Sequence, residues 1–194
     1  LTMSAHKVHG PKGIGAVYIK TGTPIKKLIQ GGEQESGRRG GTTNVPGVVG
    51  MGKAMAIAVR DIDVNNKKLQ DLTEYFVNKL NYAIPDIKFN GNFNQKAPGI
   101  VNVSFKYIEG ESILVKLDLE GVAVSTGSAC ASNSLEKSHV LKAMGLSHED
   151  INGAIRFSFG ADNTKEEIDY VVEKLVTIVA DLRKMSPLSR KKGK

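Results

Sequence analysis

Hydrophobic and polar residues follow two different periods along this chain of 194 residues, and together they predict a mixture of helices and strands. After Pro46, apolar residues recur at helical spacing from about residue 48 to about residue 82. This spacing predicts a long helix that bridges two domains or breaks near Asp61. A final helix is predicted after Thr164 and Glu167, which fit a capping box. Its apolar stripe consists of Ile168, Val171, Leu175, Ile178 and Leu182.

Shorter segments alternate between apolar and polar residues, as strands do. The sequences GIVNVSF at 99–105 and AIRFSF at 154–159 predict two such strands, with Arg156 on the polar side of the second. GIGAVYIK at 13–20 predicts a short buried strand, and GVAVS at 121–125 is a further strand candidate. Because strands and helices are mixed along the chain, the predicted fold class is α/β or α+β.

Composition and charge narrow the function classes. Hydrophobic residues make up 40% and charged residues 24%, which is ordinary for a globular protein. Of the net charge of +7, the tail at 183–194 supplies +6, so the body of the chain is almost neutral. A solvated tail is the simpler interpretation, and binding to nucleic acid or an acidic partner is the alternative. A single cysteine excludes an internal disulfide and favours the cytoplasm. No apolar run is long enough to predict a membrane span.

The segment SAHKVHGPKG at 4–13 carries the first candidate chemistry. Lys7 is a potential nucleophile if its surroundings disfavour the ammonium form. Ser4 and His6 can both donate hydrogen bonds to an anion such as a phosphate. The alternative is that Lys7 is an ordinary solvated lysine in a turn.

Three further candidates lie along the chain. Cys130 is the only cysteine, and small polar residues surround it in the segment 124–146, which favours a reactive thiol over a small buried hydrophobe. Arg156 has the planar guanidinium that suits a carboxylate, although an ordinary surface arginine is the alternative. The glycine-rich segment 30–47 contains Thr42 and is either a ligand-binding loop or a flexible connector.

Four motifs together resemble the cysteine desulfurases of the NifS/IscS group. The motifs are SAHKVHGPKGIGAVYI, GGEQESGRRGGTTNVPG, STGSACASNSLEKSHVLKAMG and IRFSFG, and the resemblance runs from about residue 3 to Leu188. It implies the aspartate-aminotransferase-like fold type I of enzymes that depend on pyridoxal phosphate. Members of that group are about twice as long, so the chain is expected to be the C-terminal half.

The resemblance also implies a cofactor site. Lys7 matches the lysine that holds pyridoxal phosphate through its amine. Ser4 and His6 match side chains that bind the cofactor phosphate, and Thr42 matches a phosphate contact that the group supplies across its dimer interface. No metal ligand is implied. The residues that contact the cofactor ring in the group belong to the missing N-terminal half.

The implied reaction converts L-cysteine to L-alanine and leaves a persulfide on the enzyme. Arg156 matches the arginine that binds the substrate carboxylate, and Cys130 matches the nucleophile that accepts the sulfur. The implied partners are a second copy of the chain and an iron–sulfur scaffold protein similar to NifU or IscU. The alternative for the 194-residue chain taken alone is a non-catalytic module that binds a partner and lacks a complete cofactor site.

The resemblance further implies a domain organisation. Residues 1–63 are expected to be the end of the large cofactor-binding domain with the start of the bridging helix. Residues 64–185 are expected to be the small C-terminal domain that carries Cys130. Residues 186–194 are expected to be a basic tail.

Overall fold

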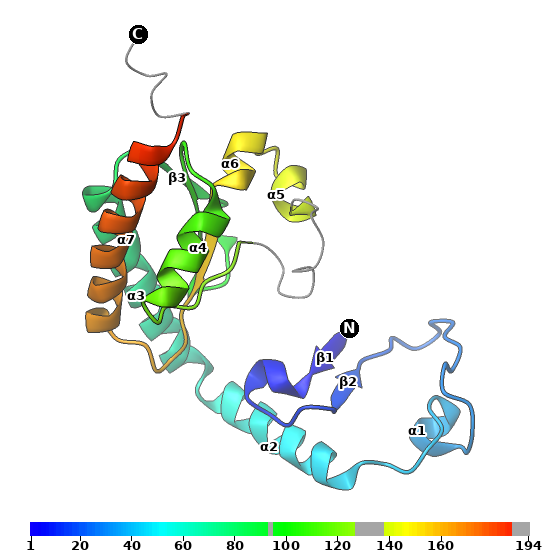
Figure 1. Ribbon diagram of the computed structural model, residues 1–194. Helices are drawn as coiled ribbons and strands as arrows, with labels where there is room; N and C mark the ends of the chain where they lie inside the picture. Colours follow the sequence, from blue (N-terminus) through cyan, green and yellow to red (C-terminus); the bar gives the residue numbers. More distant parts are fainter. Residues whose placement is uncertain (93–94, 127–137, 188–194) are drawn as a thin grey trace. The chain divides into compact units, whose positions relative to one another are not determined.

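The computed structural model describes residues 1–92, 95–126 and 138–187, and it divides the chain into two compact units (Figure 1). Unit 1 is Leu1–Val64 and unit 2 is Asn65–Lys194. The boundary expected from the resemblance, after residue 63, differs from this division by one residue.

Unit 1 combines a small sheet with helices. Strand β1 (Thr2–Ser4) pairs in antiparallel fashion with β2 (Gly15–Val17), and the 3-10 helix η1 (Ala5–Val8) follows β1 directly. The short turn α1 (Gln34–Gly37) lies within the glycine-rich segment, and helix α2 (Val45–Arg60) comes after it.

The strand predicted within residues 13–20 forms, but the prediction that it is buried is wrong. Val17 is 55% exposed and Tyr18 is 65% exposed. The reason is that β2 pairs with β1 alone among the described strands, and every residue of β2 is exposed.

The long helical segment breaks at Asp61, which is one of the two alternatives that the sequence predicted. Helix α2 ends at Arg60 and α3 (Ile62–Ala83) begins after the break. The Asp61 carboxylate accepts hydrogen bonds of 2.7 and 2.8 Å from the Arg60 guanidinium. Helix α2 begins three residues earlier than predicted, because the Asn44 side chain caps its start and Pro46 fits the first turn without losing a hydrogen bond.

The described part of unit 2 contains a three-stranded antiparallel sheet in the order β3–β4–β5. The strands are β3 (Ile87–Asn90), β4 (Ile100–Phe105) and β5 (Ala154–Ser158). The alternation of residues correctly predicted β4 and β5. The predicted strand at 121–125 does not form, and only Ser125 makes an isolated bridge to the sheet.

Helices precede, separate and follow the strands of this sheet along the chain. Besides α3, unit 2 contains α4 (Gly110–Leu119), α5 (His139–Ala143), α6 (His148–Asn152) and α7 (Lys165–Met185). The predicted capping box at the start of α7 is confirmed. Within the described ranges, no helix combines the length and the apolar character that crossing a membrane requires.

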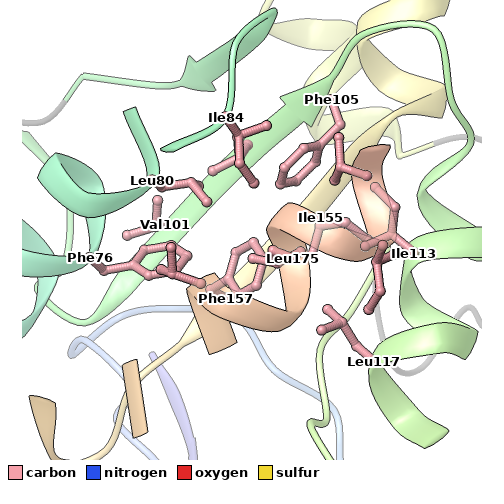
Figure 2. Packing of buried hydrophobic residues seen from close by; sticks show 14 of the residues in the cluster. Phe76, Leu80, Ile84, Val101, Phe105, Ile113, Leu117, Ile155, Phe157 and Leu175 are labelled. Atoms are coloured by element: carbon pink, nitrogen blue, oxygen red, sulfur yellow. The ribbon is translucent and has the colours of Figure 1, made fainter. Parts of the chain in front are cut away.

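One face of the sheet forms the hydrophobic core of unit 2. Alternate residues of β4 and β5 point to this face, and side chains of α3, α4 and α7 pack against them (Figure 2). The Phe76 ring of α3 lies 4.8 Å from the ring of Phe157 and 5.3 Å from that of Phe159. The sheet residues of the core are Val101, Val103, Phe105, Ile155 and Phe157.

The opposite face of the sheet is polar, and α6 is attached there through Asp150. The Asp150 side chain is buried and pairs with Lys88 of β3 at 2.8 Å and with Lys106, which follows β4. The Ser104 hydroxyl of β4 donates to the Asp150 backbone carbonyl at 2.7 Å. Hydrogen bonds from Lys106 and Lys88 lower the pKa of Asp150 from 3.8 to about 2.

Replacing Phe76 with alanine tests the core. Phe76 is fully buried between two other aromatic rings, so Phe76→Ala is expected to lower the free energy of unfolding by about 3 to 5 kcal/mol. Urea denaturation followed by circular dichroism measures the change. Tyr82→Ala is the control on the same helix, because Tyr82 is 96% exposed. An equal loss in both variants would contradict the packing described.

Replacing Asp150 with asparagine tests the attachment of α6. Because the folded state lowers the pKa of Asp150, this group stabilises the fold above pH 3.8 and loses its effect as the pH falls through about 2. Asp150→Asn is therefore expected to cost about 2 kcal/mol of unfolding free energy at neutral pH. The difference between the two proteins should shrink between pH 4 and pH 2.

Denaturant titrations at a series of pH values measure this difference. The control is Asp71→Asn, which removes an exposed ion pair with Lys67 and should change stability little at any pH. A pH-independent difference between wild type and Asp150→Asn would show that the two lysines do not stabilise the Asp150 carboxylate.

Candidate functional site

Lys7 lies in a turn that is built around one buried alanine. Ala5 is fully buried, its N–H donates to the carbonyl of Ile14 at 3.1 Å, and its carbonyl accepts from the N–H of Gly10 at 2.8 Å. His9 closes the turn in the left-handed conformation, with φ of 61°. The turn that carries Lys7 is therefore fixed by its backbone rather than by its side chains.

Helix α2 packs closely against this turn (Figure 1). A Cβ atom on Gly10 would lie 2.9 Å from the carbonyl oxygen of Ala5 and 3.2 Å from the Cβ of Ala54 in α2. A Cβ atom on Gly50 of α2 would lie 2.6 Å from the Cγ of Pro11. Both glycines are needed because any side chain would push the helix and the turn apart.

The turn presents three polar side chains within four residues. Ser4, His6 and Lys7 are exposed, and none of their side chains has a hydrogen-bond or ion-pair partner in the described part of the chain. Ser4 lies at the N-cap position of η1, but its hydroxyl does not cap the helix. A hydroxyl, an imidazole and an amine on one turn form a donor set that fits a phosphorylated aldehyde.

Thr42 lies in the segment between α1 and α2 and is exposed. Neighbouring residues stabilise this segment: the N–H of Gly41 donates to Gln34 Oε1 at 3.2 Å, and Asn44 caps α2. No hydrogen bond joins Thr42 to the Lys7 turn among the described residues.

Arg156 lies in unit 2, on the polar face of the sheet. Its cross-strand partner in β4 is Asn102, and on its other side the backbone of Ser125 pairs with it through hydrogen bonds of 2.7 and 3.2 Å. Arg156 is half-buried, and its guanidinium has no acidic or other side-chain partner among the described residues. This guanidinium is thus available to an external anion.

The remaining predicted residue, Cys130, lies outside the described residues. Ser125, which pairs with Arg156, precedes it by five residues in the sequence. Of the predicted site residues, the structure therefore groups Ser4, His6 and Lys7 in unit 1 and places Arg156 in unit 2.

Sequence reasoning missed a hydrogen-bond network beside Arg156. Asn90 of β3 donates through Nδ2 to Asn102 Oδ1 and to Ser104 Oγ, both at 2.7 Å. The alternation in the segment 99–105 places Asn102 and Ser104 on one face of the strand, and this pattern was the available signal.

The family model described as aminotransferase class-V matches residues 1–171. The chain belongs to this family. The class-V aminotransferase match covers all of unit 1 and the described sheet of unit 2, so Lys7, Thr42 and Arg156 all fall within it.

Curated relatives of this class-V chain include cysteine desulfurases from several organisms. The cysteine desulfurase IscS of Dictyoglomus turgidum is 49% identical over 187 residues, which is 96% of this chain and 48% of that protein. The cysteine desulfurase IscS of Clostridium botulinum strain Hall is 50% identical over 190 residues. The predicted resemblance to cysteine desulfurases is confirmed. The chain spans about half the length of the curated relatives it matches.

Solved structures support the same conclusion about the fold. A NifS-like protein superposes with a TM-score of 0.82 at 39% identity, over 93% of this chain and 46% of that one. The NifS-like protein from Rickettsia africae also gives a TM-score of 0.82, at 30% identity, over 92% of this chain and 47% of that one. The predicted fold class, part of a fold type I enzyme of the aspartate-aminotransferase kind, is confirmed.

Replacing Gly10 with alanine tests the close approach of α2 to the Lys7 turn. The added methyl group would contact Ala5 and Ala54, so Gly10→Ala is expected to cost about 1 to 3 kcal/mol of unfolding free energy. Gly52→Ala in α2 is the control, since no atom lies within 4 Å of its added Cβ. Alanine there should stabilise α2 by about 0.5 to 1 kcal/mol. Denaturant titration of both variants distinguishes the two effects, and a neutral Gly10→Ala would contradict the packing.

Proposed function

We propose that the full-length protein is a cysteine desulfurase that depends on pyridoxal phosphate and converts L-cysteine to L-alanine and an enzyme persulfide. The observation that carries this proposal is the identity of about half of all positions to proteins named cysteine desulfurase, across 96 to 97% of the chain. These relatives are named as enzymes, which favours catalysis over a binding module without activity.

In this proposal, the Lys7 turn holds the cofactor. Lys7 binds its aldehyde through Nζ, and Ser4 and His6 donate hydrogen bonds to its phosphate. These three roles are supported by the exposure of all three side chains on one turn and by their lack of other partners among the described residues. When bound, pyridoxal phosphate supplies an electron sink for the bonds at the substrate Cα. Thr42 contacts the phosphate that a second subunit holds, so the protein is a homodimer.

The substrate is held by Arg156 and loses its sulfur to Cys130. The guanidinium of Arg156 binds the carboxylate of L-cysteine, and Lys7 Nζ moves the proton at the substrate Cα. The bond between the substrate Cβ and sulfur breaks, and a sulfur–sulfur bond forms on Cys130 Sγ. A proton takes the place of the sulfur on Cβ, which yields L-alanine.

The persulfide sulfur then passes to an acceptor. We place the protein in iron–sulfur cluster assembly in the cytoplasm, with a scaffold protein similar to NifU or IscU as the acceptor. In this assignment, unit 1 belongs to the large cofactor-binding domain and unit 2 is the small domain that carries Cys130. The 194-residue chain alone is inactive, because it spans half the length of its relatives.

Two single substitutions in the full-length protein test the assigned roles. Cys130→Ala removes the sulfur acceptor, so it should abolish alanine formation from L-cysteine while the protein stays yellow. Lys7→Ala removes the amine that binds the cofactor, so it should lose the visible absorbance of lysine-bound pyridoxal phosphate together with the activity. Absorbance spectra and an assay of alanine and sulfide measure both effects.

Lys12→Ala serves as the control for Lys7→Ala, since Lys12 is an exposed lysine of the same segment. It should keep the colour and the activity. Full desulfuration by Cys130→Ala would remove the role given to that thiol, and a wild-type protein without conversion of cysteine would refute the proposed function as a whole.

A further inference from the structure

The polar face of the sheet in unit 2 places four polar residues in one row across the strands. Asn90 of β3 is the cross-strand partner of Asn102 in β4, and Asn102 is the partner of Arg156 in β5. Ser125 continues the row on the far side of Arg156. Side chains of directly opposed residues in antiparallel strands lie on the same face and within reach of one another. Arg156 therefore has Asn102 as a lateral neighbour.

The orientation of the Asn102 amide follows from its hydrogen bond to Asn90. Asn102 Oδ1 accepts from Asn90 Nδ2 at 2.7 Å, so the oxygen faces the β3 side. The NH2 group is at the other end of the planar amide, away from the bond to Asn90, and Arg156 is the cross-strand neighbour on the other side of β4.

Asn90 is itself held in place on the sheet. It donates a second bond to Ser104 Oγ at 2.7 Å, and that hydroxyl donates to the carbonyl of Asp150. The Asp150 carboxylate is bound by Lys88 and Lys106. Asn102 is thus joined through Asn90 and Ser104 to the backbone carbonyl of Asp150, and these bonds set which end of its amide faces β3.

This arrangement sets hydrogen-bond donors beside hydrogen-bond donors. The guanidinium of Arg156 has donors only, and the Asn102 group facing it is also a donor. Neither group has a partner for these donors in the described part of the chain. Both donor groups are half-buried, and one external acceptor between them, such as an anion, would satisfy both.

We propose that Asn102 is a specificity-determining residue whose Nδ2 donates a hydrogen bond to the substrate carboxylate bound by Arg156. This inference rests on the proposed function, because it names a second ligand for the same substrate group. A carboxylate has about four acceptor sites, so it receives a bidentate pair from the guanidinium and a further bond from the amide. The site therefore selects for substrates with a free α-carboxylate.

Asn102→Asp in the full-length protein tests this directly. The variant keeps the shape of the side chain but replaces the NH2 donor with a second acceptor oxygen. The new carboxylate repels the substrate carboxylate and pairs with Arg156. KM for L-cysteine is therefore expected to rise at least about tenfold, with a smaller change in kcat. Calorimetric titration with L-alanine should show a matching loss of affinity. Asn78→Asp, which adds the same charge at an exposed position of α3, should leave both values unchanged.

The possible outcomes separate this inference from the proposed function. If wild type converts cysteine to alanine and Asn102→Asp keeps its KM within about twofold, Asn102 does not donate to the substrate and the inference fails alone. If Asn102→Asp does not fold, Asn102→Ala provides the same test, because loss of the donor should raise KM while a structural role would lower the melting temperature without raising KM. Absence of desulfurase activity in wild type would refute the proposed function, and the titration with L-alanine would still test the carboxylate site.

Discussion

The alternation of side chains along β4 is the constraint on which unit 2 depends. Val101, Val103 and Phe105 enter the core, while Asn102 and Ser104 between them face the opposite side. A shift of one residue in the pairing with β5 would place both polar groups in the core and expose three large apolar side chains. The same packing that stabilises the domain therefore also fixes the register in which Arg156 and Asn102 become neighbours.

In unit 1, the candidate residues Ser4, His6 and Lys7 lie on a turn that begins at the last residue of β1. Ala5 is buried, and the backbone bonds of Ala5 to Ile14 and Gly10 close the turn on both sides. Close contact with α2 then restricts the turn further, and this contact needs glycine at Gly10 and Gly50. The consequence is that Lys7 is presented on a fixed backbone, although its side chain has no hydrogen-bond or ion-pair partner among the described residues.

The sequence allowed most of the fold to be predicted where the periodic pattern was long. The break near Asp61 and the final helix are confirmed, as are β4 and β5. Strand β3 was missed although its residues IKFN alternate between apolar and polar, because a run of four residues is weak evidence for a strand. The burial of β2 was predicted wrongly, because apolar composition does not show whether a strand has neighbours to cover it. The segment 121–125 has the composition of a strand, but only one of its residues reaches the sheet.

The candidate site was predictable to the extent that its residues are close in sequence or match a motif. Ser4, His6 and Lys7 lie within four positions of the sequence, so their proximity was predictable. The structure adds their exposure and the conformation of the turn that carries them. The role of Asn102 depends on strand register and on the direction of an amide. Neither is visible in the sequence, because Asn90, Asn102 and Arg156 come from three separate segments of the chain.

The polar face of the sheet also separates its charges in a way that favours one binding position for an anion. Lys88 and Lys106 both lie on this side of unit 2, but each is already paired with Asp150. The low pKa of Asp150 means that this carboxylate stays ionised throughout the physiological range and keeps both lysines occupied. Arg156 lacks such a partner among the described residues. A carboxylate that approaches this face therefore gains most at Arg156, because binding there breaks no existing ion pair.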